Sequence, residues 1–188
     1  MNRTIRPRSQ SGFTLFELVI VMMIIGILAA IGVPSFKYIT ASNRIATEIN
    51  GLVGDLQYAR SEAIKQGLPV TVCASTDGAT CANSSTWSTG WIVFVDLNAD
   101  KIVTNNVDLI LRKQPALATG DTLVASSNAV TAIVFNREGY ASTGATSTIV
   151  LELQSTPVNA QWTRCLAVTA IGGLTIERSG ASQPTTCT

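Results

Sequence analysis

Few side chains in this chain of 188 residues could do chemistry, and the most unusual of them is Glu17. Its carboxylate directly precedes an apolar run, Leu18 to Val33, that contains no charged or strongly polar residue. A carboxylate at the edge of an apolar helix is costly in lipid and usually has a partner. A free α-amine is the natural partner, and a cut between Gly12 and Phe13 would create one on Phe13. Glu17 could then neutralise this amine in its own chain or in a neighbouring copy.

The four cysteines, Cys73, Cys81, Cys165 and Cys187, form the second group of reactive side chains. None belongs to a Cys-x-x-Cys pair, and the sequence has no histidine to complete a zinc site. Four cysteines allow three pairings, and the spacings favour Cys73–Cys81 and Cys165–Cys187 because each bond closes a local loop. Disulfides indicate an oxidising compartment, whereas free thiols in a cytosolic protein are the alternative.

Catalysis and metal binding have little support in the sequence. Without histidine the chain lacks the commonest general base and the commonest metal ligand, and we expect it not to be an enzyme. Asp96, Asn98 and Asp100 resemble the start of a calcium loop, but Lys101 stands where such loops have glycine. A hairpin loop held by Asx turns explains the same residues, so we expect no metal and no cofactor.

A single long helix, from about residue 13 to about residue 66, is predicted to position Glu17. Its first part, residues 13–33, is about 20 residues long and would span ~30 Å, the thickness of a hydrocarbon core. The basic residues Arg3, Arg6 and Arg8 precede it, which predicts a cytoplasmic N-terminus and export of the rest. After Pro34, where a kink is allowed, residues 34–66 continue as an amphipathic helix that Gly67 and Pro69 end.

One face of this second part carries apolar residues at helical spacing, and a sheet must cover it. These residues are Ile45, Ile49, Leu52, Leu56, Ala59 and Ala63. Charged residues lie between them and are expected to face water: Arg44, Glu48, Asp55, Arg60, Glu62 and Lys65.

Residues 67–188 are predicted to form a β-rich head of about seven short antiparallel strands, which together with the helix indicates an α+β fold. The strands are expected at residues 69–74, 90–96, 108–112, 130–135, 148–153, 164–169 and 173–177. Trp87, Trp91 and Phe94 could form a platform for carbohydrate, but general burial trends favour a place in or around the core.

The segment Gly12-Phe13-Thr14-Leu15-Phe16-Glu17, with basic residues before it and Pro34 after the apolar run, resembles the signal of type IV pilins and type II secretion pseudopilins. The resemblance implies that a prepilin peptidase cuts off residues 1–12 and methylates the new N-terminal Phe13. It also implies that Glu17 is the assembly carboxylate. The alternative interpretation of this N-terminal segment is an ordinary secretory signal peptide that ends near Ala29-Ala30.

A second resemblance lies in the head and points to the GspH/FimT branch of minor pilins and minor pseudopilins. It is carried by residues 87–100, by Phe135 followed by Gly139, by the segment Arg164-Cys165-Leu166 and by the final Cys187. Some DNA-uptake members of this branch have a Gly-Arg-x-Arg motif. The matching residues here are Gly172-Gly173-Leu174-Thr175, without either arginine, and Arg178 alone neutralises few phosphates, so we expect weak or absent DNA binding.

These observations predict a structural minor pilin, anchored by one span in the bacterial inner membrane with a periplasmic head. It would co-assemble with other minor pilins and the major pilin in a tip complex that primes a type IV pilus. A minor pseudopilin of a type II secretion system and a tip module that binds DNA or a surface ligand are the alternatives.

Overall fold

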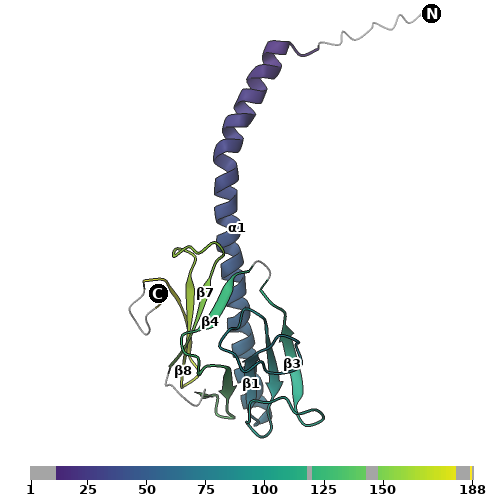
Figure 1. Ribbon diagram of the computed structural model, residues 1–188, viewed down its shortest axis with the longest axis vertical. Helices are drawn as coiled ribbons and strands as arrows, with labels where there is room; N and C mark the ends of the chain where they lie inside the picture. Colours follow the sequence, from purple (N-terminus) through teal and green to yellow (C-terminus); the bar gives the residue numbers. More distant parts are fainter. Residues whose placement is uncertain (1–11, 118–119, 143–147, 181–186, 188) are drawn as a thin grey trace, which may run out of the picture. The chain divides into compact units, whose positions relative to one another are not determined.

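The computed structural model of the protein describes residues 12–117, 120–142, 148–180 and 187 (Figure 1). The basic leader expected at residues 1–12 therefore lies outside the described residues, except for Gly12. The chain divides into two compact units, Met1–Thr40 and Ala41–Thr188. The second unit holds the later turns of the helix together with all the strands.

Helix α1 (Leu15–Gln66) is the only helix in the part of the chain that the structure describes. It ends at Gly67, whose φ of 68° closes the helix in a conformation that glycine adopts at little steric cost. The Gly67 amide donates to the Ala63 carbonyl at 3.0 Å. The predicted end at about residue 66 is confirmed, and the helix begins at Leu15 rather than Phe13. Its backbone is helical at residue 34, and a kink there stays a prediction.

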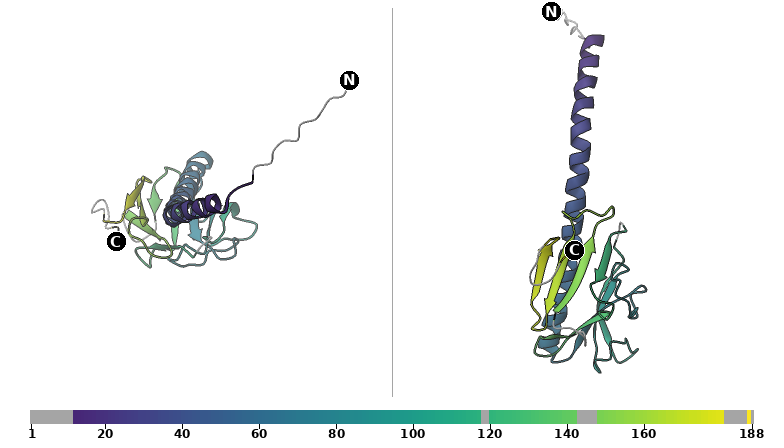
Figure 2. Two further views of the ribbon diagram at one scale, coloured as in Figure 1. Left: turned by 90° about the horizontal axis from the view of Figure 1, so that it is seen from above. Right: turned by 60° about the vertical axis from the view of Figure 1, so that its left-hand side comes forward.

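Nine strands follow α1 among the described residues, and they form two antiparallel sheets. The first sheet has the strand order β3-β2-β1-β5-β6 and the second has the order β4-β7-β8-β9. Figure 2 shows them as two separate groups, teal and yellow-green, beside the later turns of α1. The bounds are β1 (Val70–Ala74), β2 (Trp91–Val95), β3 (Leu109–Gln114), β4 (Thr122–Ala125), β5 (Ala132–Phe135), β6 (Ala141–Ser142), β7 (Thr148–Gln154), β8 (Arg164–Thr169) and β9 (Leu174–Arg178).

The α+β class is confirmed, but the head has two sheets where one sheet of about seven strands was expected. The two strands that the sequence analysis missed are β4 and β6. With only two residues, β6 is too short to show an alternating pattern. Strand β4 alternates exposed and buried residues over four positions, and it is placed by pairing with β7 rather than by a strong pattern of its own.

The core lies where the apolar face of α1 meets both sheets. All six residues of the predicted stripe, Ile45 to Ala63, are at most 2% exposed. Alternate residues of the strands point at them, such as Val70 and Val72 of β1 in the first sheet and Leu151 of β7 in the second. Trp87, Trp91 and Phe94 are buried as well, so the aromatic side chains belong to cores and offer no platform for a sugar.

The outer face of each sheet carries a smaller apolar cluster with a disulfide in it. On the first sheet, Ile92 and Phe94 pack with the Cys73–Cys81 bond, which explains why every residue of β2 is buried. On the second sheet, Val150 packs with the Cys165–Cys187 bond. The pairing favoured by the cysteine spacings is thus the one in the structure, and each bond ties a loop or tail to the back of a sheet.

The expectation that the charged residues of the helix face water is wrong at four positions: Arg44 and Glu48, which are described with the site, and Asp55 and Arg60. Asp55 is 9% exposed, accepts a hydrogen bond from Trp91 Nε1 at 2.9 Å and forms an ion pair with Arg112 Nη1 at 2.9 Å. Arg60 is half-buried and donates to three backbone carbonyls in the turns of the two sheets. These side chains face the edge of the core because partners across the fold compensate their burial.

Candidate assembly site

The residues expected to carry assembly, Gly12, Phe13 and Glu17, lie at the start of α1. Gly12, Phe13 and Thr14 precede the first helical residue, and the Phe13 side chain is 83% exposed. A Cβ added to Gly12 would meet no heavy atom within 4 Å, so Gly12 lies in open space among the described residues. Cleavage at the Gly12–Phe13 bond and methylation of Phe13 stay predictions.

Thr14 caps the helix and thereby fixes the position of Glu17. The amide of Glu17 donates to Thr14 Oγ1 at 3.2 Å, and the amide of Leu18 donates to the Thr14 carbonyl at 3.2 Å. This is the spacing of a capping box, in which a threonine N-cap is followed by glutamate at the third helical position. A carboxylate there also interacts favourably with the helix dipole. The backbone amide of Glu17 therefore takes part in the helix cap, which the sequence analysis did not consider.

The helix surface beyond Glu17 is apolar and uncovered. The large apolar side chains from Leu18 to Ile39 are all at least 42% exposed, and this stretch makes α1 long and apolar enough to cross a membrane. A helix that is apolar on all sides needs lipid or neighbouring helices around it. Phe13 and Glu17 are four residues apart in the sequence and lie together at the end of this surface. An amine at Phe13 would therefore place opposite charges at one end of the helix.

The loop considered for calcium uses its carboxylates within the protein. Asp96 is fully buried and accepts hydrogen bonds from Thr71 Oγ1 at 2.8 Å and from the amide of Lys101 at 3.0 Å. Asp100 accepts from the Asn98 side chain and from the Ile102 amide, both at 2.8 Å. These are the Asx-turn contacts of a hairpin loop. Calcium binding was not expected here, and that expectation stays a prediction.

The turn between β8 and β9 holds the residues compared with a DNA-binding motif. Gly172 and Gly173 lie in the turn, and Leu174 and Thr175 begin β9. The structure also brings Arg164 opposite Arg178 in the β8–β9 ladder, so Arg178 has a second cation beside it. Arg164 donates to the carbonyls of Gln161 and Thr163 at 2.9 Å each, and its guanidinium is partly engaged within the protein.

Comparison with known protein families gives two matches, one near the N-terminus and one over the later helix and most of the head. Residues 7–33 match the prokaryotic N-terminal methylation motif, and residues 48–172 match the family described as type II transport protein GspH. The second match covers most of the head. The chain belongs to the GspH family. The resemblance to the pilin and pseudopilin superfamily is thereby confirmed, and the family consists of structural subunits rather than enzymes.

Individual proteins are also similar to parts of this chain or to its fold. A fimbrial protein of Pseudomonas aeruginosa is 40% identical over 68 residues, which cover 36% of this chain. The match covers 44% of that protein, so the chain spans less than half the length of the curated relatives it matches. The type IV minor pilin FimU of Pseudomonas aeruginosa has a similar fold, with TM-scores of 0.57 and 0.52 in two crystal forms. The first form is 23% identical and covers 81% of this chain and 99% of FimU as crystallised.

One charged cluster of this GspH-family head was missed from the sequence. Arg44 forms two hydrogen bonds to Asp121, from Nε at 2.6 Å and from Nη2 at 2.9 Å, and the Thr156 amide donates to Asp121 Oδ1 at 2.7 Å. Glu48, one turn after Arg44, is half-buried, and its Oε2 is buried without a donor among the described residues. Burial and, to a lesser extent, the nearby Asp121 carboxylate together raise the pKa of Glu48 to about 7, although Arg44 opposes the rise.

Arg60 was also missed as a structural residue of the head. Its guanidinium donates to the carbonyls of Gly139, Gly172 and Ile171 at 3.0 Å each, and so joins the β5–β6 turn to the β8–β9 turn. A Cβ on Gly172 would lie 2.3 Å from the Gly139 carbonyl oxygen and 2.8 Å from Arg60 Nε, so only glycine fits there. The glycines at 139 and 172 were the available sequence signal, because both have positive φ in turns.

Proposed function

We propose that this protein is a minor pilin that co-assembles with other minor pilins and the major pilin at the tip of a type IV pilus. It would be inserted in the bacterial inner membrane with the head in the periplasm, and a prepilin peptidase would cleave after Gly12 and methylate Phe13. The observation that supports this best is the start of α1, where Glu17 occupies the first turn of a helix with an uncovered apolar surface. The match to the methylation motif supports the processing step.

The physical basis is the exchange of lipid for neighbouring helices. In the bilayer, the apolar surface of residues 18–33 is solvated by lipid, and the Glu17 carboxylate is the costly group. In a bundle of such helices the apolar surface stays covered, while the carboxylate can meet the Phe13 amine of a neighbour. That ion pair would be formed only on assembly and would set the axial register of the subunit.

A Glu17→Ala variant tests the proposal, with cleavage and incorporation into filaments measured separately in a strain that makes the pilus. We expect normal cleavage and loss of the subunit from sheared filaments. Because Glu17 also sits in a capping box, Thr14→Ala is the matched control. It removes the cap, which costs about 1 kcal/mol, but keeps the carboxylate. Thr14→Ala should still be incorporated; equal loss in both variants, or normal incorporation of Glu17→Ala, would refute the assembly role.

A minor pseudopilin of a type II secretion system is the second candidate. The family description, a type II transport protein, favours it, and the same N-terminal chemistry would serve both machines. Deletion of the gene separates the two candidates, because a loss of surface pili with normal protein secretion supports the pilus. A secretion defect with normal pili supports the secretion system.

A tip module that captures DNA is a weaker candidate, since the β8–β9 turn lacks the arginine pair of the DNA-uptake motif. Arg164 and Arg178 are adjacent in the ladder, but two cations neutralise few phosphates. We expect no band shift of double-stranded DNA at nanomolar protein and physiological salt. A salt-dependent shift that Arg178→Ala abolishes would overturn this expectation.

A further inference from the structure

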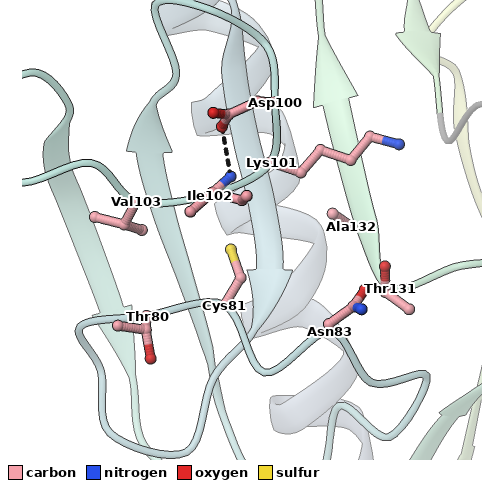
Figure 3. Close-up of a pocket in the computed structure, with 9 residues that line it drawn as sticks. All are labelled: Thr80, Cys81, Asn83, Asp100, Lys101, Ile102, Val103, Thr131 and Ala132. Atoms are coloured by element: carbon pink, nitrogen blue, oxygen red, sulfur yellow. Dashed lines mark hydrogen bonds between the residues drawn. The ribbon is translucent and has the colours of Figure 1, made fainter.

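The outer face of the first sheet contains a pocket of about 360 Å³ between two loops (Figure 3). One wall is formed by residues 80–83, at and just after the end of the loop that the Cys73–Cys81 bond closes, and the opposite wall is the β2–β3 loop, at residues 100–103. Thr131 and Ala132, at the start of β5, complete the lining. Three separate segments thus converge on a cavity that the assembly site does not use.

The interior of this pocket is aliphatic. Cys81 and Val103 pack against the small cluster on the outer face of the sheet, and Ala132 belongs to that cluster. Ile102 lies at the pocket and is 62% exposed. Figure 3 shows no aromatic side chain among the labelled residues. A lining of this kind favours a compact aliphatic group over a sugar or base that would stack on an aromatic face.

Neutral polar groups are available beside the aliphatic lining. The Asn83 amide and the Thr131 hydroxyl line the pocket, and neither forms a side-chain hydrogen bond within the part of the chain that the structure describes. Asp100 and Lys101 also lie at the lining with opposite charges. Two adjacent opposite charges give no net attraction for phosphate or another anion. A carboxamide and a hydroxyl together can instead donate to and accept from a peptide group.

The backbone of the two walls is held in uncommon conformations. Four non-glycine residues have positive φ in the described chain, and all four lie in these loops: Asn83 at 48°, Ala99 at 54°, Lys101 at 65° and Asn106 at 65°. Asn83 and Lys101 line the pocket. Such conformations cost free energy and concentrate at binding sites, and here the disulfide and the Asx turns maintain them.

We propose that this pocket binds an uncharged segment of a partner polypeptide, with an aliphatic side chain against Val103 and Ala132 and a backbone amide group at Asn83 and Thr131. The volume holds one aliphatic side chain together with its peptide groups, and the exposed Ile102 extends the apolar contact outside the cavity. This binding function is additional to filament assembly through α1. Its test needs no filament, so its failure leaves the proposed assembly role untouched.

The test is a titration of the full-length protein in detergent micelles, with ¹³C-labelled isoleucine and alanine methyl groups. The probe is N-acetyl-leucine N-methylamide, which supplies one aliphatic side chain and two peptide groups. We expect saturable shifts of the Ile102 and Ala132 methyl signals with a Kd on the order of 1 mM, typical of a ligand of this size. N-acetyl-glycine N-methylamide should bind at least about fivefold more weakly, because it lacks the side chain.

Two variants make the result specific. Asn83→Gly removes the amide and keeps the positive φ, and it should weaken binding about fivefold. Asn106→Gly makes the same change at φ 65° outside the lining and should bind like the wild type. The proposal is overturned if the probe gives no saturable shifts or if the two variants bind equally. It is also overturned if glucose or inorganic phosphate saturates the same methyl signals more tightly than the peptide probe.

Discussion

Replacing Glu48 with glutamine removes a charge that the folded head disfavours at and above neutral pH. Burial, helped by the nearby Asp121 carboxylate, raises the pKa of Glu48 from 4.5 to about 7. Between these two values the folded protein keeps a proton that the unfolded chain has lost. Stability therefore falls as the pH rises from about 4.5 through about 7. Glutamine stays neutral, has a similar size and carries an amide donor that the ionised carboxylate lacks.

The magnitude follows from the size of the shift. A change from 4.5 to about 7 would correspond to about 3 kcal/mol for a fully buried group. Glu48 keeps part of its side chain in water, which screens the interaction, so we expect Glu48→Gln to gain about 1–2 kcal/mol at pH 8. For a chain of this length that is a rise in Tm of about 2–8 °C. At pH 5 both folded proteins carry a neutral group there, so the gain should be much smaller than at pH 8.

The assay is thermal unfolding of the full-length protein in detergent micelles, followed by circular dichroism at pH 5, 6, 7 and 8. Glu62→Gln is the control on the same helix, because hydrogen bonds from Gln66 and Lys65 lower the pKa of that carboxyl group. It should give no gain at pH 8. The reasoning is refuted if Glu48→Gln has no higher Tm than the wild type at pH 8, or if the gain is the same at pH 5.

Three further outcomes are expected. Gly172→Ala should lower the free energy of unfolding, measured by chemical denaturation, by at least about 2 kcal/mol, because its Cβ would meet the Gly139 carbonyl oxygen at 2.3 Å. The control is Gly180→Ala, at φ 85° in open space, which should lower the free energy of unfolding clearly less. Arg60→Lys should lower the free energy of unfolding in the same measurement by about 1–3 kcal/mol, because an ammonium cannot reach all three carbonyls. A change near zero would show that these hydrogen bonds do not stabilise the head. Calorimetric titration with millimolar Ca²⁺ should give no binding heat, and a saturable signal lost in Asp100→Asn would contradict the Asx-turn interpretation.

Local patterns were sufficient to predict the helix, most strands and both disulfides. The apolar residues of α1 recur at helical spacing, Gly67 ends the helix, and the longer strands are rich in β-branched residues. The cysteine pairing was predictable because each bond closes a short stretch of chain, eight residues for Cys73–Cys81 and 22 for Cys165–Cys187. In each case the signal lies within one segment of the sequence.

The features that escaped prediction depend on contacts between distant segments. Arg44 and Glu48 look like an exposed pair on one helix face, and only the fold brings Asp121, 77 residues after Arg44, against them. Strand β4, which follows Asp121, is likewise defined by its partner β7. A short strand or a half-buried carboxyl group has no pattern of its own. The position of such a strand or carboxyl group depends on a neighbour from a distant segment, and the periodicity of its own segment does not identify that neighbour.

The polar contacts of α1 fix the register of the helix on the sheets, which its apolar stripe alone does not determine. A stripe of aliphatic residues at helical repeats could pack on the sheets after sliding by a turn, about 5.4 Å, with a modest loss of burial. Arg44 binds Asp121 beside the second sheet, Asp55 binds Trp91 and Arg112 in the first, and Arg60 binds turns of both. A slide of one turn would break all three sets and leave buried polar groups unpaired, each costing about 1–3 kcal/mol. The apolar face therefore supplies the attraction, and these three residues select one register of the helix on the head.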